Sequence, residues 1–217
     1  MTPAEWRRAW PPGHLMRPID RPDLPPGARA FARDYGLPSV LIFEIEGASA
    51  CRPFEWRFHP LEKELVPFTK LLRRAEWGDD DDARLNELWS DQLMIADEEF
   101  CNGNAAICVH SSLEHISRLD WEIEDAGNFV NTSIAQFAES MLTLVGWCEK
   151  HGRGSFSDRK ANVQQLLGAL GQIDANAITR ARSLPPMWPI LIEGVITYEG
   201  TDRCDVTSDP TRSKSRF

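Results

Sequence analysis

The amino-acid sequence predicts an α+β domain. Three short apolar runs, at residues 93–96, 106–110 and 115–120, have the length and composition of strands. They are followed by a long amphipathic segment that opens at Ser133 and keeps an apolar residue at every third or fourth position as far as Cys148. A helix with such a stripe must bury it, and the preceding strands supply the surface.

Residues 1–27 are expected to form a short helix and a proline-rich lead. Thr2 and Glu5 have the spacing of a capping box, and Pro3 suits the first helical position because that position needs no backbone N–H. Pro11 and Pro12 end the helix, and the lead should run extended over the surface.

Residues 28–151 are expected to form the core. A helix over 28–35 ends at Gly36, and strands follow at 40–45 and 54–58. The three apolar runs come next, with residues 97–104 between the first two predicted as a loop. The helix that opens at Ser133, which has capping-box spacing with Gln136, then runs to the cap at Gly152.

Residues 152–200 are expected to form a C-terminal helical appendage that packs on the core. A break at 152–155 precedes a helical pattern at 160–170, and Asp174 can cap a further helix through Arg182. The apolar stretch 187–198 should dock on the main body. Residues 201–217 are polar and are expected to form a flexible tail.

Composition restricts the class of protein. The 217 residues carry a formal net charge of −9, which argues against nucleic acid or an anionic membrane surface as a partner and favours a basic one. The five cysteines form no CxxC pair, so neither a zinc ribbon nor a disulfide framework is predicted. No apolar run approaches the roughly 18 residues of a membrane span, and we expect a cytoplasmic protein.

Several segments resemble the SMI1/KNR4 superfamily, also called SUKH, and its SUKH-4 immunity-protein branch in particular. Tyr35-Gly36-Leu37-Pro38 is similar to the family's GLP element. The strand at 94–96, the run 103–109 and the segment Phe129-Val130-Asn131-Thr132-Ser133 through Phe137 follow in the family's order. Residues 173–174 with Trp188 and 191–193 are similar to the branch's C-terminal pattern.

The resemblance implies a single domain whose mixed or antiparallel sheet is covered by helices. It also implies a binding role without catalysis or a cofactor. Bacterial members look like immunity proteins that neutralise toxins delivered between competing cells, and the partner would then be a cognate, basic toxin domain. The alternative is an intracellular regulatory or scaffold module of the SMI1/KNR4 type. Oligomeric state is left open.

Acidic and aromatic side chains are the candidate partner contacts, because Trp anchors often dominate interface energy and acidic surroundings steer a basic partner. Each has a plainer alternative: the acidic runs can be solvated loops, and we favour a core position for Trp121. The candidates are Trp77, Asp79, Asp80, Asp81, Asp82, Glu98, Glu99, Trp121, Glu122 and Glu124.

Catalysis is the weakest of the alternatives. Asp97, Asp120, His110 and His115 are residue types found at hydrolytic metal sites, and the two histidines should lie close across a hairpin. Nothing resembles HExxH, a P-loop or GxSxG. Isolated surface histidines greatly outnumber ligands, so we predict no catalytic, cofactor or metal site.

Overall fold

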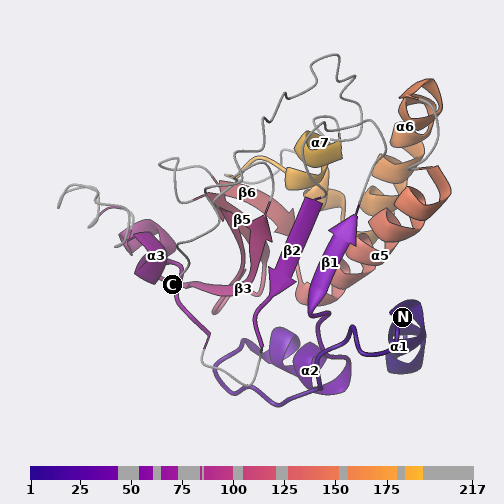
Figure 1. Cartoon of the computed structure of the whole chain (residues 1–217). Coiled ribbons are helices and arrows are strands. Elements are labelled where there is room, and N and C mark those ends of the chain that lie inside the picture. Colours follow the sequence, from indigo (N-terminus) through magenta and orange to yellow (C-terminus); the bar gives the residue numbers. More distant parts are fainter. Residues whose placement is uncertain are drawn as a thin grey trace, which may run out of the picture.

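The protein is described by a computed structural model (Figure 1). The described residues are 1–43, 54–60, 65–72, 84, 86–99, 105–120, 127–151, 156–179 and 184–192.

A six-stranded antiparallel sheet forms the centre of the molecule, in the order β1-β2-β3-β4-β5-β6. Each strand therefore pairs with its neighbours in the sequence, which confirms the α+β class with an antiparallel sheet. The strands are β1 (Val40–Phe43), β2 (Phe54–Phe58), β3 (Gln92–Glu99), β4 (Ala105–His110), β5 (Ile116–Asp120) and β6 (Gly127–Asn131).

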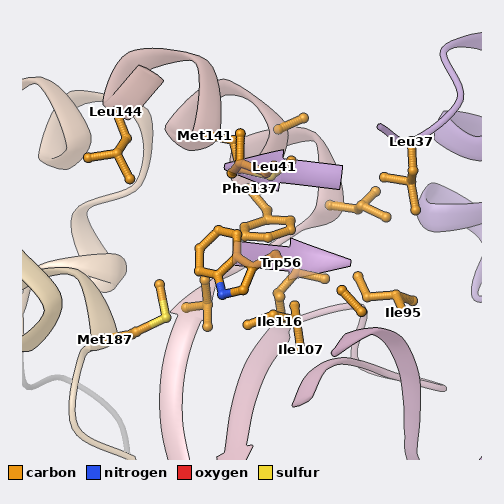
Figure 2. Close-up of a cluster of buried hydrophobic side chains, with 14 of the residues drawn as sticks. Leu37, Leu41, Trp56, Ile95, Ile107, Ile116, Phe137, Met141, Leu144 and Met187 are labelled. Carbon is orange, nitrogen blue, oxygen red and sulfur yellow. The ribbon is translucent and has the colours of Figure 1, made fainter. Parts of the chain in front are cut away.

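One face of the sheet carries the main core and is covered by helices from both ends of the chain. Trp56 of β2 is fully buried there between the sheet and Phe137, as Figure 2 shows. The covering helices are α2 (Pro26–Asp34), α5 (Ile134–His151), α6 (Phe156–Ile173) and α7 (Met187–Leu191). Apolar side chains from all four helices and from the sheet belong to one continuous cluster, so α6 and α7 share the main core with the sheet.

The opposite face of the sheet carries a smaller core. Met94, Cys108 and Leu119 are buried there against Phe68 and Trp89. Phe68 directly precedes the short helix α3 (Thr69–Leu72), while Trp89 ends a helical stretch at 86–89. β3, β4 and β5 are thus covered on both faces, which explains why β4 reads as an unbroken apolar run.

The N-terminal helix α1 (Pro3–Ala9) is confirmed together with its cap. Thr2 and Glu5 exchange the two hydrogen bonds of a capping box. Trp6 and Trp10 lie on one face, with their rings in an edge contact at 5.2 Å, and the indole N–H of Trp6 donates to the Gly36 carbonyl. Gly36 ends the α2 segment with a φ of +76°, as its predicted role requires.

Two expectations about boundaries are wrong, and one strand was not predicted. Residues 97–99 continue β3 rather than starting a loop. The helix expected from Asp174 is a single 3₁₀ turn, Ala175–Ala177, and residues 178–179 are not helical. β6 was not anticipated as a strand. The expected break at 152–155 and tail at 201–217 lie outside the described residues.

Within the described parts of the chain, no helix combines the length and apolarity needed to cross a membrane.

Candidate functional site

Three chain connections leave the sheet at the same end, which we call the loop end. The register pairs Phe43 with Phe54, Glu98 with Ala105, and Ala105 with Asp120, so the β1–β2, β3–β4 and β5–β6 connections all start from it. Connections held by a rigid sheet are common recognition sites because they vary without disturbing the core.

Two of the sequence-predicted contact residues lie in the described chain at the loop end. Glu98 and Glu99 are the last residues of β3. Trp121, Glu122 and Glu124 directly follow β5 in the sequence but lie outside the described residues, as do Trp77, Asp79, Asp80, Asp81 and Asp82.

Glu98 is not a surface residue, which corrects its assignment as a partner contact. It is 2% exposed and lies on the helix-covered face of the sheet, directly opposite Trp56. Its carboxylate accepts from Arg118 Nε at 2.8 Å and Nη2 at 2.6 Å, and from the indole N–H of Trp56 at 3.0 Å. Because alternate strand residues face opposite sides of the sheet, the strand places Glu98 inside.

Arg118, the partner of Glu98, lies in β5, and β4 separates the two strands. Burial disfavours the charged guanidinium, but the hydrogen bonds and charge of Glu98, together with Asp120, outweigh it and raise the pKa of Arg118 above its ordinary value. The pair is bidentate, which fixes its geometry. The Glu98–Arg118 pair therefore links β3 to β5 beneath the loop end, and its charges are not available to a partner.

The other face of the sheet presents charge near the loop end. Glu55 lies opposite Glu99 in the register and is paired with Arg57 at 2.7 Å. Asp97 is 46% exposed, and His59 Nε2 lies 3.1 Å from its carboxylate. These side chains were not among the predicted partner contacts, because single charges in a strand look unremarkable in the sequence. Asp120, by contrast, is half-buried on the same face as Glu98 and Arg118.

A second polar centre lies at the opposite end of the sheet, around Asp174. Its carboxylate accepts from the Thr132 N–H at 2.6 Å, the Thr132 hydroxyl at 3.1 Å and the Asn176 N–H at 3.1 Å. Asn131 donates to Asp174 and to Ser140, and accepts from the indole N–H of Trp188 at 3.1 Å.

This network joins β6, α5, the turn after α6, and α7. Only Ser133 serves the start of α5, accepting from the Gln136 N–H at 3.3 Å, whereas Asn131 and Thr132 bind Asp174 instead. Sequence reasoning missed this role because Asp174 is about forty residues away from both. Every group in the network is hydrogen-bonded within the protein, so we interpret the network as part of the structural core.

His110 and His115 lie close across the β4–β5 hairpin, as predicted, with ring centroids 4.8 Å apart. Nδ1 of His110 accepts from the N–H groups of Ser112 and Leu113, both at 3.2 Å. Both bonds use the Nδ1 lone pair, which ties this ring nitrogen to its own turn. His110 caps the turn.

Among the residues that the structure describes, no three His, Cys, Asp or Glu side chains are grouped to hold a metal ion. Cys108 and Cys148 are buried free thiols. Burial raises the pKa of Cys148 to about 12 and shifts that of Cys108 in the same direction. The raised pKa values favour the protonated thiol, as is typical of core cysteines.

The described strands form an antiparallel meander sheet in an α+β fold, and three chain connections start from one end of that sheet. Comparison with protein-family models, with curated proteins and with solved structures finds no match to this chain.

Proposed function

We propose that the protein is an immunity protein that binds a bacterial toxin directly in the cytoplasm and neutralises it without catalysis. The observation that carries the proposal is the loop end: three connections leave one end of a sheet that is covered on both faces at its centre. Connections that start from a rigid sheet suit binding a protein partner.

Charge supports the choice of a basic partner. The chain carries a net charge of −9, and the connection after Asp120 contains Glu122 and Glu124. Acidic groups around an interface accelerate encounter with a basic surface and penalise acidic competitors. The order of sequence segments that resembles the SUKH-4 branch supports the same role.

A binding role without catalysis is supported by how the buried polar groups are used. The carboxylate of Glu98 is bound by Arg118 and Trp56, that of Asp174 by backbone and hydroxyl donors, and His110 by its own turn. Each of these groups therefore has a structural task.

The test is co-expression with the toxin encoded next to this gene, followed by gel filtration of the pair. The wild-type protein should protect the cell and co-elute with the toxin. Replacing Glu122→Lys together with Glu124→Lys should weaken binding by roughly tenfold or more, chiefly through a slower association rate.

Glu149→Lys is the control for charge reversal itself, because it reverses one charge at an exposed position in the last turn of α5. It should leave protection unchanged. Persistent toxicity with no complex would refute the proposed function and favour the regulatory scaffold, whereas a complex insensitive to the double variant would refute only the loop end as its surface.

A further inference from the structure

The two edges of the sheet differ in whether another described segment covers them. At the β6 edge, the N–H of Phe129 donates to the carbonyl of Pro185 at 2.8 Å, and Phe129 forms a parallel bridge with Pro186. The segment before α7 therefore covers this edge. β1 forms the other edge of the sheet, and no described strand pairs with its outer side (Figure 1).

The backbone of β1 has groups that point away from the sheet. The N–H of Phe58 donates to the carbonyl of Ser39, and the bonded positions alternate along an antiparallel pair. Leu41 and Phe43 consequently bond to β2, while the N–H and C=O groups of Val40 and Ile42 point outward. Nowhere in the described chain does another segment hydrogen-bond to these outward groups.

The chemistry of this edge is apolar and locally neutral. β1 reads Val-Leu-Ile-Phe, with none of the lysines, prolines or bulges that usually protect an edge strand. Ile42 is 51% exposed. The nearest charges on its face of the sheet, Glu55 and Arg57, are paired with each other.

We propose that β1 pairs with β1 of a second copy of this chain, forming a continuous antiparallel sheet across a two-fold axis at Leu41. In this register Val40 faces Ile42 of the second copy, and the converse pair follows by symmetry. Two such pairs exchange two hydrogen bonds each, using every outward group of both residues. A two-fold axis makes the interface self-complementary.

A second copy fits this edge better than a basic partner does. The chain as a whole is strongly acidic, yet the strand offers no charge to select a basic surface and no like charge to repel its own copy. Pairing also brings Val40 and Ile42 of one copy against Ile42 and Val40 of the other on the same face. That contact covers the exposed Ile42 side chain.

The interface is small, since a single short strand from each chain forms it, so the dimer should be weak and depend on concentration. Sedimentation velocity over a roughly hundred-fold concentration range measures this directly. The mass should rise from 24.6 kDa towards twice that value. Hydrogen exchange should slow at the Val40 and Ile42 amides with increasing concentration, while the Leu41 amide stays protected throughout.

Two variants separate edge pairing from other contacts. Ile42→Pro removes only an N–H that points away from β2, which an edge strand tolerates, and Ile42→Lys adds a charge while keeping the backbone donor. Both should remain monomeric over the same range with unchanged circular dichroism. Leu88→Lys, which alters a 50%-exposed leucine elsewhere, should dimerise like the wild type.

If Ile42→Pro does not fold, Ile42→Lys carries the test. A wild-type chain that stays monomeric throughout overturns the proposal, as does a dimer that persists in both variants. Slowed exchange at Val40 and Ile42 only when a different protein is added also overturns it, because that result assigns the edge to a foreign strand. The inference is independent of the proposed function.

Discussion

Asp174 shows how much of this fold depends on one buried carboxylate. Its oxygens satisfy donors from the Thr132 and Asn176 backbones and from Asn131, and through Asn131 the same network reaches Ser140 and Trp188. A buried donor that loses its acceptor retains the cost of desolvation without the bond.

Replacing Asp174→Ala should therefore lower the free energy of unfolding by roughly 1–3 kcal/mol or more, because several donors lose their acceptor together. Urea denaturation measures the loss. Glu149→Ala, at an exposed position, should change stability by less than about 0.5 kcal/mol. If the two variants are equally stable, the network contributes nothing.

Removing one partner of the Glu98–Arg118 pair should lower the free energy of unfolding more than replacing both partners together. Glu98→Gln leaves the guanidinium without its counter-charge and should cost roughly 2–3 kcal/mol, below the value for fully buried pairs because water still reaches Arg118. The Glu98→Gln, Arg118→Met double variant should lose less than the sum of the single losses. Additive losses in this double-mutant cycle would show that the two residues are not coupled.

Residue roles of this kind were largely hidden from sequence analysis. Glu98 and Glu99 look like a soluble loop because two adjacent carboxylates are costly to bury alone, and the partner that makes burial tolerable, Arg118, is twenty positions away. Local patterns identify caps such as Thr2 and Ser133, whose partners lie three residues along the chain, but not a partner from another strand.

At the scale of elements, the start of α2 is completed by a residue from a distant hairpin. Its N-cap, Pro25, has no side chain to accept a hydrogen bond, and Glu114 supplies one by accepting from the Gly27 N–H at 2.9 Å. Glu114 has a φ of +62°, a conformation that carries a strain cost in residues other than glycine. A methyl group added at Gly27 would collide with the Glu114 carboxylate.

Two substitutions at Glu114 should separate the cap from the strain. Glu114→Ala loses the cap and keeps the strained backbone, whereas Glu114→Gly loses the cap but relieves the strain. The glycine variant should be the more stable of the two by roughly 1 kcal/mol, as measured by thermal unfolding. The reverse order would show that this backbone conformation is not strained in the folded protein.

Elements with a strong periodic signal were predicted and the others were not. α5 combines a capped start with an uninterrupted apolar stripe, and its predicted and observed limits agree closely. β6 was missed because Gly127, Asn128 and Asn131 have low strand propensity. Asp174 does cap a turn, accepting from the Asn176 N–H, but the turn is a single 3₁₀ turn that ends at Ala177.

At the scale of the whole molecule, the hydrophobic core extends beyond residues 28–151, the segment predicted to form it. Val163, Leu166 and Leu170 of α6 and Trp188 of α7 belong to the same cluster as the sheet residues. Trp188 contacts Trp56 at 6.0 Å between ring centroids. Sequence analysis predicted this packing from the apolar stretch, but it could not show how completely the core is shared.

A chain shortened to residues 1–151 should consequently fail to fold cooperatively, because it exposes the apolar surface that α6 and α7 cover. Nuclear magnetic resonance should show collapsed chemical-shift dispersion, while the full chain unfolds in a single transition. A well-dispersed spectrum from the shortened chain would show that residues 1–151 form an autonomous domain.

The contact between Phe129 and Pro185 has a consequence for biosynthesis. On the ribosome, β1 to β6 emerge in the order in which they pair, so the meander can assemble progressively. Pro185 is synthesised more than fifty residues after Phe129, and until then the outer edge of β6 lacks this hydrogen-bond partner. Nascent chains stalled before this point should accordingly be the species that chaperones retain.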